Sequence, residues 1–125
     1  MVRSTAAKSI DESIARSEVP WHKYRTVRSQ QVVEALQDAG YEQVEAYNIN
    51  SRAIRVRVVD PRFAGLSKGE RIALMDDVLK ALPEEIELDI TMIVPITREE
   101  FGNPSVESWI LHGNFDFENP AKSVL

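Results

Sequence analysis

The stretch that most constrains the fold is residues 56–82, VRVVDPRFAGLSKGERIALMDDVLKAL. It begins within a run in which apolar and basic residues alternate: Ile54, Arg55, Val56, Arg57 and Val58. This alternation predicts a strand with one buried face and one basic, solvated face. Proline cannot donate a hydrogen bond to a sheet, so Pro61 predicts that the strand ends near Asp60.

A helix is predicted directly after this turn. Ser67 and Glu70 have the spacing of a capping box, in which each side chain accepts a hydrogen bond from the backbone amide of the other residue. Pro83 marks the end of the helix. Between these limits lies an apolar stripe at helical spacing, formed by Ile72, Met75, Val78, Leu79 and Leu82.

The preceding segments predict a helix and a hairpin. Residues 29–39 have helical periodicity, with Ser29 as the expected cap and Gly40 as the expected end. The residues from there to Asp60 are typical of two strands, which we expect to be joined through the loop 48–52.

A third strand is predicted over residues 88–96, where apolar residues alternate, and the spacing of Thr97 and Glu100 predicts a short last helix. The order is therefore helix, strand, strand, helix, strand, short helix. A strand, a helix and another strand in succession favour a right-handed parallel crossover. We predict an α+β fold, in which a three-stranded mixed sheet has its helices on one face.

The sequence predicts one domain between two flanking segments. Residues 1–25 are polar and predict a mobile N-terminal arm, although the aromatic and basic residues at 21–25 either pack on the core or stack on nucleic-acid bases. Residues 26–101 form the predicted domain. Residues 102–125 predict an irregular aromatic tail, which we expect to pack on the domain or on a second subunit of a homodimer.

Composition narrows the possible functions. The 125 residues carry a net charge of −5, which disfavours binding to nucleic-acid phosphates. Residues 52–71 nevertheless hold six basic and two acidic residues, so this segment is either a local basic patch or an ordinary solvated face. There is no cysteine, and no apolar run has the length of a signal peptide or a membrane span. We therefore expect a cytoplasmic protein that does not bind a membrane.

The turn and the elements around it resemble the BolA family, whose fold is KH-like. Arg62, Phe63, Gly65 and Ser67 match the turn motif of that family, and Arg71 matches its following helix. The closing IVPITREEF is similar to the last strand of the family and the helix start after it. The resemblance covers residues 28–101 and implies the α-β-β-α-β-α order of a class II KH-like domain.

The resemblance implies an activity that this chain is not equipped to perform. BolA proteins partner monothiol glutaredoxins and share a [2Fe–2S] cluster, using a helix histidine and a histidine or cysteine in the hairpin loop. Ile72 stands at the position of the helix histidine, and residues 48–52 contain neither histidine nor cysteine. We therefore predict a divergent member without cluster ligands, and no cofactor.

No residue pattern predicts an enzyme. His22 and His112 each lack a second ligand at metal spacing, and no serine lies in a nucleophile motif. We predict no catalytic residue and no metal site. The G-x-x-G motif with which KH domains hold a nucleotide backbone is also absent.

The turn itself has two interpretations. Arg62 offers a fork that recognises carboxylate or phosphate groups. Alternatively the turn is structural: Phe63 fills the core, Gly65 adopts a backbone angle that favours glycine, and Arg62 pairs with Asp60 or Glu70.

Two functions remain. The first is a non-catalytic interaction or regulatory domain, which binds an unknown protein partner through the turn and the helix behind it. The alternative is a KH-like protein that binds nucleic acid through the basic strand around Arg55 and Arg57. The candidate surface for either function consists of Arg52, Arg55, Arg57, Arg62, Lys68 and Arg71.

Overall fold

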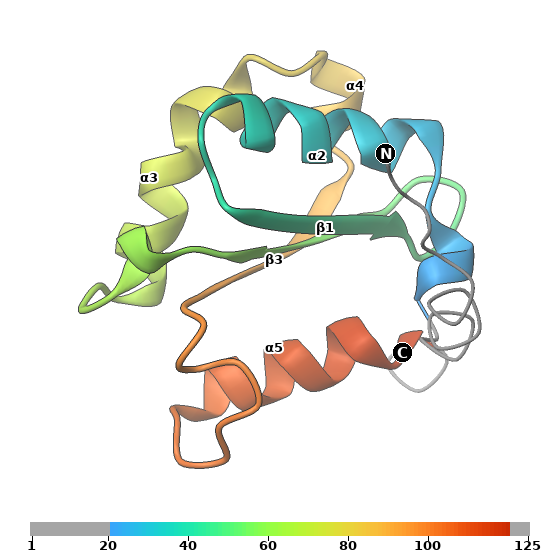
Figure 1. The fold of residues 1–125 in the computed structure, drawn as a ribbon. Coiled ribbons are helices and arrows are strands. Elements are labelled where there is room, and N and C mark those ends of the chain that lie inside the picture. Colours follow the sequence, from blue (N-terminus) through green and yellow to red (C-terminus); the bar gives the residue numbers. More distant parts are fainter. Residues whose placement is uncertain (1–20, 121–125) are drawn as a thin grey trace, which may run out of the picture.

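The computed structural model describes residues 21–120 of the chain (Figure 1). It has the predicted α+β fold with a three-stranded mixed sheet. The elements in chain order are η1 (His22–Tyr24), α2 (Val27–Asp38), β1 (Gln43–Asn48), β2 (Ile54–Val59), η2 (Pro61–Phe63), α3 (Lys68–Lys80), α4 (Glu84–Glu87), β3 (Ile90–Ile96) and α5 (Ser108–Glu118).

Strand β2 lies in the centre of the sheet, between β1 and β3. It pairs antiparallel with β1, where Ala46 lies opposite Val56, and parallel with β3, where Val58 lies opposite Pro95. The predicted parallel pair and the predicted end of the strand before Asp60 are both confirmed. All of β2 is buried, because helices cover both faces of the sheet.

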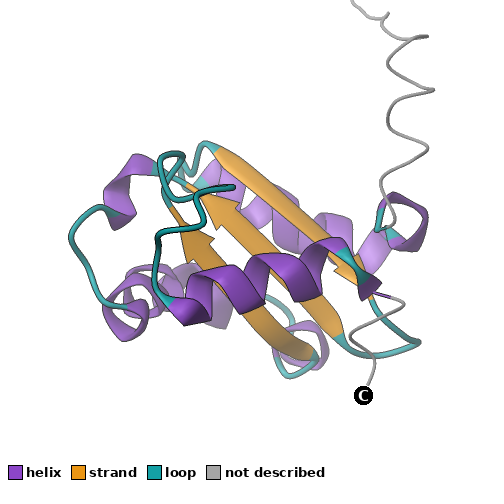
Figure 2. Cartoon of the chain, turned by 90° about the horizontal axis from the view of Figure 1, so that it is seen from below, coloured by secondary structure: helices purple, strands orange, loops and turns teal. Residues whose placement is uncertain are grey.

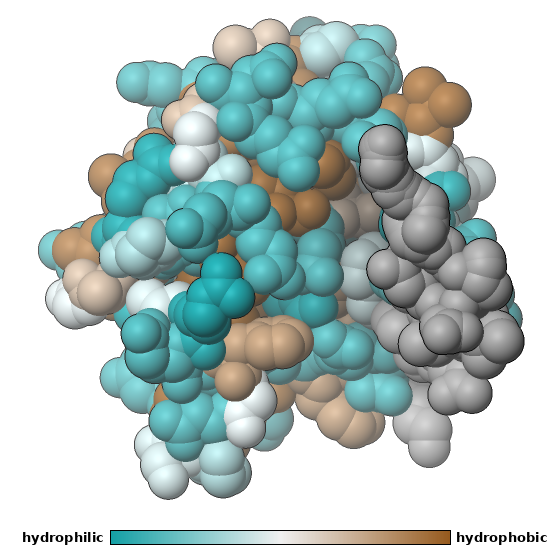
Figure 3. Space-filling model, viewed as in Figure 1, coloured by the Kyte–Doolittle hydropathy of each residue, from teal (hydrophilic) through white to brown (hydrophobic). Residues whose placement is uncertain are grey.

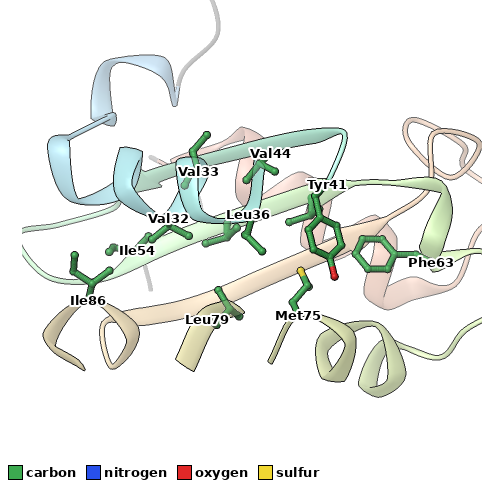
Figure 4. Packing of buried hydrophobic residues seen from close by; sticks show 13 residues of the cluster. Val32, Val33, Leu36, Tyr41, Val44, Ile54, Phe63, Met75, Leu79 and Ile86 are labelled. Atoms are coloured by element: carbon green, nitrogen blue, oxygen red, sulfur yellow. The ribbon is translucent and has the colours of Figure 1, made fainter. Parts of the chain in front are cut away.

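Helices α2 and α3 lie on one face of the sheet (Figure 1). Their apolar side chains meet those of alternate strand residues, as Figure 4 shows from close by. The rings of Tyr41 and Phe63 are stacked in this core with centroids 6.0 Å apart, so the turn after β2 is anchored there. The buried members of the cluster are Val32, Val33, Leu36, Tyr41, Val44, Ala46, Ile54, Val56, Val58, Phe63, Met75, Leu79 and Ile86.

Helix α5 covers the opposite face, so the prediction that all helices lie on one face was wrong (Figures 1 and 2). The prediction of an irregular tail after residue 101 was also wrong, because residues 108–118 form this helix. The sheet supplies the buried contact that stabilises it: Ile110 packs with Val94 and Ile96 of β3. Of the two expected locations for the aromatic tail, the structure shows the one on its own domain.

Buried rings join the beginning and the end of the described chain. Trp21, Tyr47 and Phe117 form one buried cluster, in which Trp21 stacks on Tyr47 with centroids 5.8 Å apart. The Tyr47 hydroxyl donates a 2.9 Å hydrogen bond to the Phe117 carbonyl. Core packing of this segment is therefore confirmed, and residues 21–25 do not belong to an arm as predicted. The rest of the predicted arm, residues 1–20, lies outside the described residues.

The starts of the two long helices show how reliable local capping signals are. Ser67 and Glu70 form the predicted box at the start of α3, with hydrogen bonds of 3.2 and 2.8 Å. Helix α2 begins three residues earlier than predicted. Thr26 is its cap, and Ser29 completes a capping box from inside the helix. The prediction chose Ser29 over Thr26, because the hydroxyl of either residue can serve as a helix cap.

The capping box at Thr97 and Glu100 also forms, with hydrogen bonds of 2.9 and 3.3 Å, but no helix follows it. The chain turns away at Gly102, whose φ of +77° lies in the left-handed region that favours glycine. The predicted short helix is therefore a turn. None of the helices within residues 21–120 is long and apolar enough to cross a membrane.

Helix α5 packs closely on β3 at Gly113. A Cβ atom placed there would lie 3.3 Å from a methyl carbon of Val94. We expect Gly113→Leu to lower the free energy of unfolding by about 1–3 kcal/mol, because overpacking separates the two layers. Gly69→Ala is the control, since a Cβ in α3 would meet nothing within 4 Å. Equal urea midpoints for Gly113→Leu and the wild type would contradict this packing.

Candidate functional site

The arginines of β2 lie inside the molecule. Arg55 and Arg57 were predicted to form a solvated basic face, but both are buried. The prediction was wrong because α5 covers this face of the sheet. Arg55 donates a 3.1 Å hydrogen bond to the Asp116 carbonyl of α5 and lies 3.4 Å from the Tyr47 hydroxyl.

Arg57 joins three elements through its guanidinium. Its Nε donates to Glu45 of β1 at 2.7 Å, and its Nη1 lies 2.6 Å from a carboxylate oxygen of Glu118. The same Nη1 donates to Asn114 Oδ1 at 3.3 Å. The side chain of Arg57 is only 2% exposed, and two carboxylates therefore compensate a charge that would be costly to bury alone.

Two aromatic rings complete the surroundings of Arg57. The centre of its guanidinium lies 4.7 Å from the ring centroid of Phe101 and 4.6 Å from that of Phe117. A guanidinium at this distance is attracted by the electron-rich face of a ring. Phe101 precedes α5 and Phe117 lies in it, so Arg57 also holds the loop after β3 close to the helix.

Arg71 fixes the other side of that loop. Its Nη1 and Nη2 atoms donate to the two carboxylate oxygens of Glu100 at 2.7 and 2.9 Å, and its Nε donates to the Leu66 carbonyl at 2.8 Å. These hydrogen bonds to Arg71 hold the pKa of Glu100 below its ordinary range, against the effect of burial. The arginine that matches the family helix is therefore a buried structural residue, not part of an open surface.

The turn after β2 has the structural role that one of its two interpretations predicted. Phe63 is buried, Gly65 has a φ of +78°, and Arg62 pairs with Asp60 at 3.1 Å. Burial would raise the pKa of Asp60, but hydrogen bonds from the Arg62 and Glu42 amides and from the Arg62 side chain outweigh it and lower that pKa. The Arg62 guanidinium also lies 3.7 Å from the Tyr41 ring centroid.

The remaining predicted residues lie in different places. Arg52 is exposed in the hairpin loop and lies 3.5 Å from a carboxylate oxygen of Asp89. Lys68 begins α3, and its Nζ lies 5.6 Å from the Trp109 ring centroid. Ser67 caps the same helix. Because three of the six predicted arginine and lysine residues are buried and the others are dispersed, they do not form one basic surface.

The structure instead reveals an apolar groove between α5 and the loop after β3. Its volume is about 430 Å³, and Arg57 lies at its floor beside Glu100. Phe101 is 44% exposed, Leu111 39% and Phe115 53%, although all three are large apolar residues. Figure 3 shows that hydrophilic side chains cover most of the face seen there, with smaller apolar patches that include the region of α5. The complete lining is Arg57, Glu100, Phe101, Gly102, Asn103, Pro104, Leu111, Asn114, Phe115, Glu118 and Asn119.

The lining of the groove combines apolar residues with three asparagines and three charged residues. It contains no histidine, serine, threonine, lysine or tyrosine that would act as a base or nucleophile. Its two carboxylates are ion-paired, Glu100 with Arg71 and Glu118 with Arg57. No three histidine, aspartate or glutamate side chains in the described part of the chain are arranged to hold a metal ion.

Sequence reasoning missed the groove, although one signal for it exists. Leu111 and Phe115 are four residues apart, the spacing that places two side chains on one face of a helix. The apolar residues of the tail were treated as one group that needed cover. Within α5 they divide, because Ile110 and Phe117 face the sheet and are buried, whereas Leu111 and Phe115 are exposed.

Comparisons of the chain with protein-family models, with curated proteins and with solved structures find no match.

Removing the charge of Arg57 should destabilise the fold through the two acids that remain. We expect Arg57→Met to lower the free energy of unfolding by about 2–3 kcal/mol, because Glu45 and Glu118 lose their common partner while solvent screens part of their repulsion. Urea denaturation measures the change. In the double variant with Glu45→Gln the loss should be smaller than the sum of the two single losses. Additive losses would contradict the ion pair.

The pair of Arg71 and Glu100 should make stability depend on acid pH. Because the folded pKa of Glu100 is lowered, its contribution is present above the unfolded pKa and is lost as the pH falls through the folded pKa, below the ordinary value of 4.5. Glu100→Gln should therefore be less stable than the wild type at about pH 7, with a difference that shrinks toward about pH 3. Urea unfolding across this range tests it. Glu99→Gln, at an exposed neighbour, is the control and should follow the wild type.

Proposed function

We propose that this chain is a non-catalytic, BolA-like interaction domain that binds a protein partner through the groove between α5 and the loop after β3. The observation that carries the proposal is a concentration of exposed apolar surface. Six large apolar residues are exposed in the described part of the chain, and Phe101, Leu111 and Phe115 line this one groove. Contiguous exposed apolar surface with a polar rim is typical of interaction sites.

The order of the elements supports the BolA-like part of the proposal. A helix, a hairpin, a turn with Arg62 and Phe63, a capped helix and a parallel strand follow one another as the resemblance implies. Ile72 is partly exposed on α3, at the position of the family's cluster ligand, and its side chain cannot bind iron. The proposed partner is therefore bound without a shared cluster or another cofactor.

The groove replaces the turn as the proposed contact surface. The turn residues are engaged in the core and in the pair of Arg62 with Asp60, whereas Phe101, Leu111 and Phe115 of the groove are exposed. The nucleic-acid alternative is supported less well, since Arg55 and Arg57 of its basic strand are buried and ion-paired or hydrogen-bonded. The absence of cysteine suits a reducing compartment, and we place the protein in the cytoplasm as part of the same proposal.

The proposal predicts that one exposed ring is required for capture of a partner. The tagged chain should retain a protein from the native cytosol in stoichiometric amount, and Phe115→Asp should lose it because a charge cannot enter an apolar contact. The measurement is an affinity capture compared by quantitative mass spectrometry.

Leu88→Asp is the matched control, because Leu88 is a large apolar residue, 69% exposed, outside the groove lining. It should retain the partner that the wild type retains. Equal retention by Phe115→Asp and Leu88→Asp would contradict the groove as the binding surface, and circular dichroism of both variants verifies that each is folded.

A further inference from the structure

We propose that the groove binds a peptide segment in which a large apolar side chain is flanked by lysine or arginine. This inference rests on the proposed function and adds the chemistry of the partner. It follows from three properties of the groove: its apolar walls, the unused hydrogen-bonding capacity at its floor, and the charge of its rim.

The walls select a large apolar side chain. Phe101 on one wall and Leu111 and Phe115 on the other leave an open space of about 430 Å³ between them. That volume lies in the range of about 300–1,000 Å³ that is typical of sites which bury a ligand. These three are the exposed large apolar side chains of α5 and its adjoining loop. Burying them against a partner would remove their surface from water, and such removal is the main driving force of association.

The floor selects a neutral hydrogen-bond acceptor. Arg57 Nε and Nη1 are engaged by Glu45, Glu118 and Asn114, but no acceptor within residues 21–120 bonds to its Nη2. The Arg57 side chain lines the groove and is only 2% exposed, so this N–H group has little contact with water. A partner in the groove that supplies an acceptor for it gains a hydrogen bond, because a buried donor without one is costly.

The net charge around the groove favours a backbone carbonyl over a carboxylate as this acceptor. One positive charge on Arg57 already faces two negative charges, on Glu45 and Glu118, and Glu100 is balanced by Arg71. The site therefore carries a net charge of about −1, and a further anion would be repelled. A peptide carbonyl satisfies Nη2 without adding charge.

The rim selects a basic neighbour for the apolar side chain. Glu118 is 36% exposed beside the groove and supplies the surplus negative charge, and the whole chain has a net charge of −5. A lysine or arginine next to the anchor would lie opposite this carboxylate, and such complementarity selects between partners. A second copy of the same acidic chain would bring like charges together at the groove, so it is disfavoured as the occupant.

Three capped, fluorescein-labelled peptides on one Gly-Ser framework test the inference by fluorescence anisotropy with the full chain. Their central residues are Lys-Leu-Phe-Lys, Glu-Leu-Phe-Glu and Lys-Ala-Ala-Lys. The first should bind about tenfold or more tightly than either of the others, and its advantage over the second should decrease with salt. Glu118→Gln should reduce that advantage, whereas Glu99→Gln should not.

Variants of the walls locate the binding. Phe115→Asp and Leu111→Asp should each weaken the Lys-Leu-Phe-Lys peptide about tenfold or more, while Leu88→Asp leaves it unchanged. Both groove residues are exposed, so folding does not depend on them as it does on the buried side chains. Unchanged binding in both variants would overturn the assignment to this groove.

Each remaining outcome separates this inference from the proposed function. Equal or tighter binding of the Glu-Leu-Phe-Glu peptide, lost in Phe115→Asp, would overturn the basic partner and leave the protein-binding groove in place. A dimer on a sizing column that Phe115→Asp dissociates would identify a second copy as the occupant and overturn the inference. Failure of all three peptides to bind a monomeric chain would also overturn it, and the capture experiment would then decide on the proposed function independently.

Discussion

The ion pairs of Arg57 are the interaction on which the arrangement of layers depends. A sheet face that carries a guanidinium at its centre cannot be covered by apolar residues alone, because a buried charge requires compensation. Glu45 on the neighbouring strand and Glu118 on α5 both supply it. Helix α5 therefore binds the sheet both through apolar contacts and through the carboxylate of Glu118, which compensates the buried charge of Arg57.

A second arginine makes the groove a preformed feature. Arg71 of α3 holds Glu100 with two hydrogen bonds, which fixes the loop that forms one wall. Arg57 holds Glu118 on α5, which forms the other wall. Because both walls are tied to the sheet or to α3, a partner would not have to order them on binding, and the entropic cost of association is correspondingly smaller.

Local sequence signals made most of the fold predictable. The packing of α5 on the second face of the sheet was not predictable in this way, because it depends on residues far apart in the sequence. The capping box at Ser67, the break at Pro61 and the alternation in β2 each act over a few residues, so they could be recognised directly. Charged residues in an alternating strand are ordinarily solvated, which is why Arg57 was assigned to a wet face. Its partners lie 12 residues before it and in the tail, and only the strand register and the position of α5 bring them together.

The same helix explains why the candidate site could not be read from composition. A helix with apolar residues on one side buries all of them against the sheet that it covers. Helix α5 has apolar residues on two sides. Ile110 and Phe117 are buried against the sheet, and Leu111 and Phe115 remain in water beside Phe101. Packing within the described domain leaves this second side uncovered. This apolar surface, which residues 21–120 leave open, is the physical basis of the proposed contact with another molecule.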